Sequence, residues 1–573
     1  MKESKIFGTI IKKEFIDKGW SDDKKYCVTT SDGKKYLLRI SPETMYEKRK
    51  SLFEIMHQVR ELKIPMNAPV EFGKCDEGVY TILEWINGGD LEPLLPMLPE
   101  TEQYVLGIKS GELIRKMHTI TAPANPAGIS VAQDWETRFN RKTDNKMKKY
   151  GECGIRFEGD EHVINYIEKN RHLLKNRPQS FQHGDYHAGN MMLENGELKI
   201  IDFDRYDYGD PWEEFNRIVW SAAASPHFAT GQLRGYFHGE PPEEFFSLLA
   251  FYIASNTLSS IYWALPFGKS DLDTMMNQTQ DVLKWFDNMK NPVPSWYQKD
   301  FYIQWIDGIA YKLKSQFDFS FMKDYGKVFK VYDDQDSGNI CFGIINENKK
   351  YFVKFAGAPT DRASVSAEEA IVILKHSASI YNDLAHPNLI KLIDAKAAGN
   401  GFALTYEWAE AECMHAMYPL SRKKFLQMPV EKRLLVFADI LDFFLNTAKH
   451  GYVAIYFYDG CIMYDFKTEK TFICDIDLFE KSPYINNMGR LWGSSRFMSP
   501  EEFQLGAVID EVTNVYTMGA AAFALLGGEK DRSFEKWKMN RETFDVATKA
   551  VSAERGMRQQ TIRQFMDEWK QAL

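Results

Sequence analysis

The stretch from His183 to Asn190, read as His-Gly-Asp-Tyr-His-Ala-Gly-Asn, constrains the fold of this 573-residue chain more than any other feature. After a short predicted hairpin it is followed by Ile-Asp-Phe-Asp, which contains Asp202. Asn190 comes five positions after Asp185, and Asp202 comes twelve positions after Asn190. The spacing predicts a loop, a two-stranded turn and a strand end that bring two carboxylates and one amide to one place.

These three side chains suit the transfer of a phosphoryl group from a nucleotide. Such a reaction leaves little covalent chemistry to the protein, because one carboxylate orients or deprotonates the attacking hydroxyl and hard oxygen ligands hold Mg²⁺ on the phosphates. Asp185 in the loop supplies the base, and Asn190 and Asp202 supply the metal ligands. A chance cluster of polar loop residues would explain either motif alone, but it explains the pair at this spacing poorly.

The same residues, together with Gly209-Asp210-Pro211, resemble the aminoglycoside phosphotransferase and choline kinase family. The resemblance implies a protein-kinase-like bilobal fold, a small-molecule hydroxyl as acceptor, and ATP and Mg²⁺ as cosubstrates, with GTP as an open alternative to ATP. By position it makes Asp185 the catalytic base, with His183 beside it as the residue that supports the loop. Asn190 and Asp202 become the ligands of the metal.

The resemblance also assigns residues that would bind the phosphates. Arg39 stands in a predicted strand where protein kinases have a Lys, and its planar guanidinium suits phosphate oxygens. Glu54 lies in a helix predicted from Ser51 to Leu62 and is expected to pair with Arg39. No Gly-x-Gly-x-x-Gly motif occurs in the first half of the chain. Gly19 to Lys24 is therefore the candidate for a phosphate-covering loop.

Further along, the chain offers a hinge for adenine and a region for the acceptor. The hinge residues implied by the resemblance are Glu84, Trp85 and Ile86. The polar segment from Trp135 to Arg177 is where this family inserts substrate-binding helices. Aromatic residues from Trp212 to Phe267 beside Asp134, Glu213 and Glu214 predict an acceptor with an amine or quaternary nitrogen, held by charge and cation–π contact.

Length and composition limit the remaining possibilities. A chain of 573 residues exceeds what one hydrophobic core organises, so we expect at least two domains. No apolar run approaches the ~18 residues of a membrane span, and Met1 to Phe15 is neither a secretory signal nor a transit peptide. The seven cysteines are never in Cys-x-x-Cys spacing, and a net charge of −9 disfavours nucleic acid. We therefore expect a cytoplasmic protein with neither a membrane nor nucleic acid as partner.

The second half, after a predicted linker at Asn291 to Pro294 and an amphipathic helix predicted from Phe301 to Phe317, resembles eukaryotic-type Ser/Thr protein kinases. Lys354 stands at the phosphate-binding Lys, and Asp475 stands at the metal-binding Asp of Asp-Phe-Gly. Met-Ser-Pro-Glu matches Ala-Pro-Glu, and its Glu is expected to pair with Arg558. The resemblance covers most of residues 320–573.

Departures from the kinase pattern decide what this half can do. Tyr456 falls at the catalytic Asp, Cys461 falls at the metal-binding Asn, and Ser377 stands where the paired Glu is expected. Asp459 lies three positions from the catalytic slot and would serve as base only in a remodelled loop. A pseudokinase that binds nucleotide weakly at Lys354 and Asp475 is the favoured interpretation. An active but divergent kinase that uses Asp459 is the alternative.

We therefore predict an α+β protein with two tandem protein-kinase-like bilobal folds, each with a small, mostly antiparallel β N-lobe and a helical C-lobe. Residues 1–297 are predicted to be a small-molecule kinase. Residues 298–573 are predicted to be catalytically impaired and to regulate or scaffold, through a homodimer or a protein partner. A bifunctional enzyme and a non-catalytic nucleotide-binding protein are the rivals. The acceptor stays open among aminoglycosides, macrolides, choline-like amines, amino alcohols and sugars.

Overall fold

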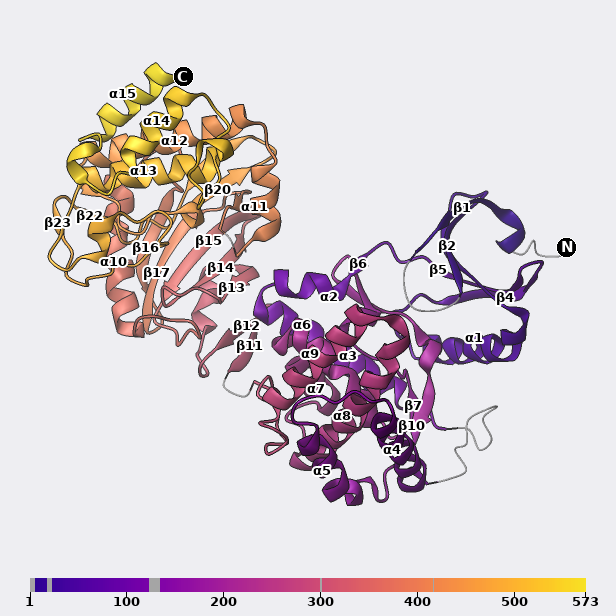
Figure 1. The fold of residues 1–573 in the computed structure, drawn as a ribbon. Helices are drawn as coiled ribbons and strands as arrows, with labels where there is room; N and C mark the ends of the chain where they lie inside the picture. Colours follow the sequence, from indigo (N-terminus) through magenta and orange to yellow (C-terminus); the bar gives the residue numbers. More distant parts are fainter. Residues whose placement is uncertain (1–5, 18–22, 123–133, 299–300, 416) are drawn as a thin grey trace. The chain divides into compact units, whose positions relative to one another are not determined.

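The computed structural model describes residues 6–17, 23–122, 134–298, 301–415 and 417–573. Its chain divides into two compact units, residues 1–299 and 300–573, shown in Figure 1. Each unit combines small, mainly antiparallel sheets with a larger helical part. The predicted mixture of helices and antiparallel strands is therefore present in both halves of the chain.

Unit 1, residues 1–299, opens with a five-stranded antiparallel sheet in the order β1-β2-β3-β5-β4. The chain crosses from β3 to β4 through α1 (Tyr46–Glu61), which covers the predicted helix. Apolar side chains on one face of the sheet form a small core that includes Val28, Leu38 and Ile82. The strands are β1 (Ile10–Phe15), β2 (Lys24–Thr30), β3 (Lys35–Ser41), β4 (Pro69–Cys75) and β5 (Gly78–Glu84).

Two short sheets carry the segment that the sequence singled out. The first is β6 (Gly89–Asp90), β8 (Met191–Glu194) and β9 (Glu197–Ile200), and the second pairs β7 (Ser180–Gln182) with β10 (Asp207–Gly209). The hairpin of β8 and β9 is the one that the sequence predicted. The loop after β7 is therefore fixed at both ends by strands.

The helical part of unit 1 packs around α8, whose side chains are mostly buried. The segment Glu243–Phe267 is long and apolar enough to cross a bilayer by length and composition, but 78% of its apolar window is buried within the protein, as in a core helix. The helices are α2 (Leu91–Leu94), α3 (Glu100–Met117), α4 (Trp135–Glu152), α5 (Asp160–Asn170), α6 (Ile218–Ala224), α7 (Pro226–Phe237), α8 (Glu243–Ala264) and α9 (Lys269–Trp285).

A stripe of glycines brings α3 and α7 into backbone contact. A Cβ on Gly107 would lie 2.1 Å from the carbonyl oxygen of Phe228, and one on Gly235 would lie 2.1 Å from that of Ile108. No side chain fits at these distances, so glycine is required on both helices.

The end of unit 1 differs from the prediction. Asn291 to Pro294 was expected to be the linker, but Trp296 and Tyr297 beyond it are buried in the core of unit 1. The hydroxyl of Tyr297 also donates a hydrogen bond of 2.6 Å to Glu240. The two prolines therefore mark a turn after α9, and the chain leaves the unit only after these aromatic residues.

Unit 2, residues 300–573, repeats the connectivity of unit 1. Its five-stranded sheet has the order β13-β14-β15-β17-β16, with α10 (Ala367–Asp383) between β15 and β16. A three-stranded sheet of β18, β20 and β21 matches that of β6, β8 and β9. The strands are β13 (Lys327–Tyr332), β14 (Asn339–Asn346), β15 (Lys349–Ala356), β16 (Leu392–Ala398), β17 (Gly401–Glu407), β18 (Glu412–Cys413), β20 (Ile462–Asp465) and β21 (Lys470–Ile473).

The helical part of unit 2 surrounds α13, which is rich in buried alanine and leucine. Two short strand pairs, β19 with β22 and β23 with β24, tie its loops together. The remaining elements are α11 (Pro419–Leu426), α12 (Val430–Lys449), α13 (Glu511–Leu526), α14 (Arg541–Ala550), α15 (Ile562–Ala572), β19 (Tyr452–Val453), β22 (Glu480–Lys481), β23 (Tyr484–Ile485) and β24 (Val508–Ile509).

The prediction of an amphipathic helix from Phe301 to Phe317 is wrong. The segment forms an antiparallel hairpin of β11 (Tyr302–Ile306) and β12 (Ile309–Leu313). Its two-residue turn is Asp307-Gly308, and both residues have positive φ, at 50° and 86°. Asp-Gly between β-branched and aromatic residues is a strong hairpin signal, which the apolar spacing obscured.

Candidate active site

The first residues of the loop after β7, His183 and Gly184, are held by hydrogen bonds to a side chain and to the backbone. His183 is buried, and its Nε2 donates a hydrogen bond of 3.0 Å to the carbonyl oxygen of Ile201. The carboxylate of Glu214 accepts hydrogen bonds from the backbone N–H groups of His183, at 2.6 Å, and Gly184, at 3.0 Å. Gly184 has φ of 83°, and a Cβ there would lie 1.9 Å from the Arg205 carbonyl oxygen. The backbone is therefore fixed immediately before Asp185.

Asp185 faces a cluster of cationic groups. Its carboxylate lies 3.3 Å from Arg217 Nε and 3.8 Å from Arg205 Nε. Burial would raise the pKa of Asp185, but Arg217 and the neighbouring cationic groups outweigh it and hold the pKa below its ordinary value. Burial lowers the pKa of His187 to about 4, so its imidazole is neutral near pH 7. Asp185 is therefore an ionised carboxylate beside a neutral histidine.

Asn190 and Asp202 have side-chain oxygen atoms that accept no hydrogen bond from the described residues. The side-chain nitrogen of Asn190 donates to the Asp185 carbonyl oxygen at 2.9 Å, which directs the amide oxygen elsewhere. Asp202 has φ of 66°, and its Oδ1 is buried without a hydrogen-bond partner in the described part of the chain. A hard cation would satisfy these oxygens, so the two residues fit Mg²⁺.

Among the described residues, no three His, Cys, Asp or Glu side chains converge as a complete metal site. That is expected for Mg²⁺ in phosphoryl transfer, where one or two protein ligands are completed by phosphate oxygens and water.

One cleft connects the predicted residues of the first half. It has a volume of about 1530 Å³, and Asp185, Asn190 and Asp202 line it. Arg39 and the predicted hinge residues Glu84, Trp85 and Ile86 line it as well. The structure thus brings these residues to one cavity, and His183 lies behind it as a buried support.

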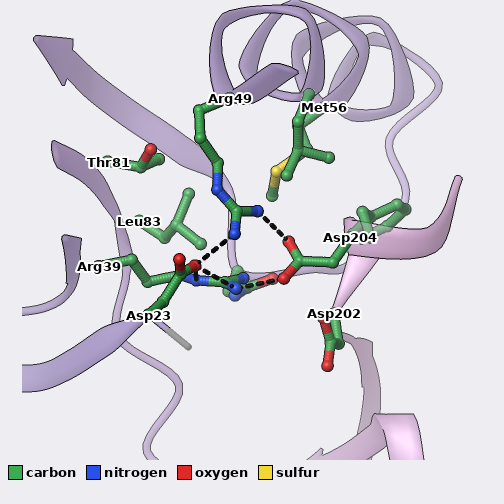
Figure 2. Close-up of a pocket in the computed structure, with 11 residues that line it drawn as sticks. Asp23, Arg39, Arg49, Met56, Thr81, Leu83, Asp202 and Asp204 are labelled. Atoms are coloured by element: carbon green, nitrogen blue, oxygen red, sulfur yellow. Dashed lines mark hydrogen bonds and ion pairs between the residues drawn. The ribbon is translucent and has the colours of Figure 1, made fainter. Parts of the chain in front are cut away.

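The phosphate end of the cleft contains two arginines and two aspartates, shown in Figure 2. Arg39 donates to Asp23 at 2.8 Å and also binds Asp204. Arg49, from α1, binds Asp204 at 2.9 Å and Asp23 at 2.7 Å. Burial would raise the pKa of Asp204, but Arg39 and Arg49 outweigh it and lower the pKa. The two guanidinium groups are therefore neutralised within the protein.

The predicted pairing of Arg39 with Glu54 is wrong. The Glu54 side chain is 63% exposed and lies 4.0 Å from Lys50, one turn away on α1. Arg49 is the residue of α1 that reaches the pocket, and the carboxylate of Asp204 takes the place expected for Glu54. The predicted phosphate-covering loop falls mostly outside the described residues, which resume at Asp23.

The carboxylates expected to hold a cationic acceptor are mostly occupied. Glu214 holds the backbone of the loop, and Asp134 caps α4 by accepting from the Thr137 N–H at 2.9 Å. Of the three, Glu213 lines the cleft, where Lys142 lies 3.5 Å from its carboxylate. The aromatic side chains Trp220, Tyr262 and Trp263 line the cleft, whereas Phe251 and Tyr252 belong to the core.

Unit 2 has the same loop with different side chains. The loop follows β19, and η10 (Asp459–Cys461) precedes β20, as η5 (Ala188–Asn190) precedes β8 in unit 1. Cys461 is buried, and its thiol lies 3.5 Å from the Tyr456 carbonyl oxygen, matching the contact of Asn190 in unit 1. Burial raises the pKa of both Tyr456 and Cys461, so both stay protonated.

The predicted nucleotide residues of unit 2 bind each other. Lys354 is buried and donates to Asp475 at 2.5 Å and to Asp477 at 2.5 Å. Burial would lower the pKa of Lys354, but the two carboxylates outweigh it and raise the pKa. Asp477 thus supplies the carboxylate that the sequence expected at Ser377. Asp204 and Asp477 occupy the same place in an Asp-x-Asp motif, which was the signal that could have identified both.

Asp459, the alternative base of unit 2, is held by two arginines. Its side chain is 2% exposed. Arg422 binds one of its oxygens, and Arg496 lies 2.9 Å from the other. Glu529 completes the cluster by binding both arginines. The carboxylate is therefore enclosed by ion pairs with Arg422 and Arg496.

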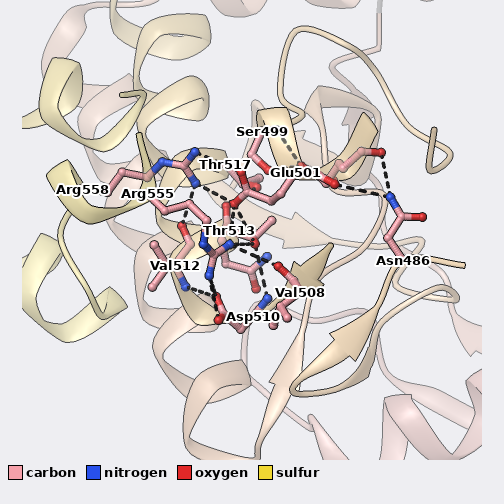
Figure 3. A network of polar contacts seen from close by, with 12 residues as sticks. Asn486, Ser499, Glu501, Val508, Asp510, Val512, Thr513, Thr517, Arg555 and Arg558 are labelled. Atoms are coloured by element: carbon pink, nitrogen blue, oxygen red, sulfur yellow. Dashed lines mark hydrogen bonds and ion pairs between the residues drawn. The ribbon is translucent and has the colours of Figure 1, made fainter. Parts of the chain in front are cut away.

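The pairing predicted between Arg558 and Glu501 is confirmed and is part of the network in Figure 3. Arg558 binds the two carboxylate oxygens of Glu501 at 2.7 and 3.0 Å. Arg555 adds a bond of 2.7 Å to Glu501 and two bonds to Asp510. This partly buried network ties η11 (Pro500–Phe503) and Asp510 to η13 (Arg555–Met557) and to Arg558, which follows it.

Comparison with known families bears on the first unit. A family model described as the phosphotransferase enzyme family matches residues 13–246. The predicted resemblance of the first half to aminoglycoside phosphotransferases and their family is confirmed by this match. No curated protein matches the chain.

Three solved structures illustrate the similarity. A thermostable mutant of aminoglycoside phosphotransferase APH(4)-Ia in its apo form is 18% identical, with 48% of this chain and 95% of that chain covered and a TM-score of 0.38. The gentamicin complex of APH(2")-IIa is 17% identical, with 47% and 91% covered and a TM-score of 0.36. A choline/ethanolamine kinase family protein from Mesorhizobium loti is 13% identical, with 49% and 91% covered and a TM-score of 0.36.

Proposed function

From the match of residues 13–246 to the phosphotransferase enzyme family, we propose that unit 1 transfers the γ-phosphoryl group of a nucleotide to a hydroxyl group of a small molecule. One observation carries the proposal: Asp185, Asn190 and Asp202 line a single cleft with Arg39 and the hinge residues. The nucleotide is ATP in this proposal, and GTP is the variant that the experiment below separates from it.

Each residue would have one task in the transfer. The acceptor oxygen forms a bond to the γ-phosphorus, its proton passes to Asp185, and the bond between the γ-phosphorus and the bridging oxygen breaks to leave the diphosphate. Mg²⁺ held by Asn190 and Asp202 would supply charge neutralisation on the phosphates. Arg39 and Arg49 would bind phosphate oxygens. The backbone at Trp85 and Ile86 would hold the adenine or guanine ring of the nucleotide.

The acid-base state of the site supports this assignment. Asp185 is ionised at neutral pH, because neighbouring cationic groups lower its pKa. The contacts from Glu214 and Ile201 fix the loop, so the carboxylate needs no rearrangement to receive a proton.

For unit 2 we propose a kinase-like module that does not catalyse transfer and instead regulates, scaffolds or dimerises unit 1. Tyr456 and Cys461 stand where the base and a metal ligand are needed, and both stay protonated. The rival, an active kinase with Asp459 as base, is disfavoured by the ion pairs that enclose this carboxylate. A cytoplasmic location remains a proposal from the sequence.

The function is tested by measuring ADP and GDP release from the full chain with ATP or GTP and a panel of hydroxyl acceptors. We expect one acceptor class to stimulate release from one nucleotide well above the hydrolysis seen without acceptor. Chelation of divalent cations should remove the stimulation. No stimulation by any acceptor class with either nucleotide would contradict the proposal.

A further inference from the structure

Four cationic side chains line the helical side of the cleft in unit 1, around Asp185. They come from three separate elements of the fold. Two lie one turn apart on α4, one lies on η6 (Phe203–Arg205) and one on η7 (Glu213–Arg217). They are Lys142, Lys146, Arg205 and Arg217. From the sequence, only carboxylates and aromatic groups were expected to bind an acceptor in this region.

Near Lys146, the positive charges of these four side chains are not neutralised by protein carboxylates. Arg205 and Arg217 lie on Asp185, and Lys142 lies 3.5 Å from Glu213. Lys146 makes no hydrogen bond or ion pair within the described parts of the chain. The charged groups that act on it are Lys142 and Arg217, which repel it, and Glu213, which attracts it.

Two other carboxylates of the cleft do not change this balance. Asp207 is bound at both oxygens by Arg138, at 2.8 and 2.7 Å. Asp271 lines the cleft but is not among the groups that act on Lys146. The space next to Lys146 is therefore locally cationic.

A half-buried lysine in such a place costs free energy, because its charge is partly removed from water and no carboxylate binds it in the described part of the chain. Burial, followed by the charge of Lys142, lowers the pKa of Lys146 to about 7. An anion bound between the two lysines would reverse this effect, since an opposite charge favours the protonated amine. The lysine is thus suited to a ligand that brings its own negative charge.

Resting on the proposed function, we propose that the hydroxyl acceptor of unit 1 carries an anionic group, a carboxylate or a phosphate, which Lys146 and Lys142 bind while Asp185 receives the hydroxyl. Trp220, Tyr262 and Trp263 line the same cleft and would cover the apolar or ring portion of the acceptor. This replaces the amine-bearing acceptor of the sequence analysis, whose expected partners Glu214 and Asp134 hold a loop and a helix end.

Binding without turnover is the first test. The full chain, free of nucleotide, is titrated with two sets of matched probes, followed by calorimetry. One set is 4-(hydroxymethyl)benzoate, 1,4-benzenedimethanol and 4-(aminomethyl)benzyl alcohol; the other is glucose 6-phosphate, glucose and glucosamine. Within at least one set, the anionic member should bind about 10-fold to 100-fold more tightly than the others, as expected for a hydrogen bond to a charged group.

Two variants on α4 show where the anion binds. Lys146→Met keeps the aliphatic stem and removes the charge, so the preference for the anionic probe should disappear. Lys148→Met is the matched control, because Lys148 is exposed on the same helix and, among the residues that the structure describes, pairs only with Glu152. Anionic members that bind no better than their neutral or amine partners, or a preference that survives Lys146→Met, would overturn the inference.

Turnover separates this inference from the proposed function. The same probes are then offered as acceptors with Mg-nucleotide, and the KM of each is measured. Anion binding that depends on Lys146 but leads to no phosphoryl transfer with any probe would leave the subsite standing and remove the proposed function. Transfer to neutral or amine acceptors at lower KM than to anionic ones, unchanged in Lys146→Met, would keep the function and reject the anionic acceptor.

Discussion

Unit 1 and unit 2 place the same backbone around different chemistry. In both units a short strand leads into the loop, a single 3-10 turn ends it, and a hairpin follows. The N–H of Asn190 donates to the carbonyl of His187 at 2.9 Å, and the N–H of Cys461 donates to that of Tyr458 at 2.9 Å. Asp202 and Asp475 then share the left-handed conformation, with φ of 66° and 57°. The backbone of the loop is thus the same in unit 2, although Tyr456 and Cys461 stand at the positions of Asp185 and Asn190. The backbone alone therefore does not indicate catalysis.

The two units also differ in how their strand cation is neutralised. In unit 1, Arg39 shares Asp204 with Arg49 at the edge of a large cleft. In unit 2, Lys354 binds both Asp475 and Asp477 and is almost fully buried. The first arrangement leaves Asp202 Oδ1 without a hydrogen-bond partner among the described residues, whereas the second engages the corresponding Asp475. The two units therefore differ in whether this aspartate is bound by the strand cation.

The largest expected effect is the loss of turnover when Asp185 is replaced, compared with replacement of Tyr456 at the matching position of unit 2. Asp185→Ala should lower phosphoryl transfer by ~10²–10⁴, because the reaction loses its positioned base. Tyr456→Phe, at the matched position of unit 2, should leave the rate unchanged. Both are measured as turnover of the full chain, with nucleotide affinity as the control for folding. Phosphorylation of the chain or of a peptide that persists in Asp185→Ala would reveal a second active centre in unit 2.

The next effect concerns the stability of unit 2. Lys354→Met leaves Asp475 and the buried Asp477 without their cation, and removing one partner of a buried pair costs about 3–5 kcal/mol. The free energy of unfolding is measured by denaturant titration of the full chain. Asp545→Ala is the control, since its partner Arg541 is exposed and such surface pairs contribute at most about 1 kcal/mol. Equal effects of the two changes would mean that the buried pair does not hold unit 2 together.

A smaller effect concerns how each loop is held. In unit 1 the Glu214 carboxylate accepts two N–H groups, whereas in unit 2 Asn514 accepts only that of Ala454 at 2.8 Å. Glu214→Gln should therefore lower kcat about 10-fold to 100-fold, the range for a disturbed buried hydrogen bond. The KM for nucleotide should not change, which a general loss of structure would not reproduce. Glu243→Gln, an exposed change on α8, is the control.

The smallest effect is a shift in pH dependence that only unit 1 can show. Arg217 favours the ionised form of Asp185, so Arg217→Gln leaves burial to dominate and raises the pKa of Asp185. The acid limb of kcat/KM should then move to higher pH, because the base must be ionised to act. The exposed Arg141→Gln on α4, a residue that does not line the cleft, is the control. A limb that stays in place would show that Arg217 does not set this pKa.

Local patterns made the centre of unit 1 predictable. Asp185, Asn190 and Asp202 are separated by one turn and one hairpin, so their proximity follows from short-range structure. The hairpin that replaces the predicted helix was missed although its signal, Asp307-Gly308, was equally local. There the 3.6-residue spacing of apolar residues was given too much weight against turn chemistry.

Partners that come from distant segments were not predictable in the same way. Arg49 and Asp204 meet across 155 positions of the chain, and Lys354 and Asp477 meet across 123. The kinase pattern led us to expect a glutamate as partner of each strand cation, at Glu54 and at position 377. In the structure, the aspartate two residues after Asp202 or Asp475 binds that cation instead. Glu214 was misread for a related reason, because a carboxylate near aromatic residues does not reveal that its oxygens face a backbone.

The pairing of Arg39 and Arg49 with Asp23 and Asp204 means that a nucleotide would enter this pocket by exchange of anions. Its phosphates would have to displace Asp23 and Asp204 from guanidinium groups that these carboxylates already neutralise, so a nucleotide gains less charge attraction here than from bare guanidinium groups. Ion pairs that are buried before and after such an exchange are screened little by salt. Nucleotide affinity should then vary weakly with ionic strength, and small anions that satisfy only one guanidinium group would compete poorly for the pocket.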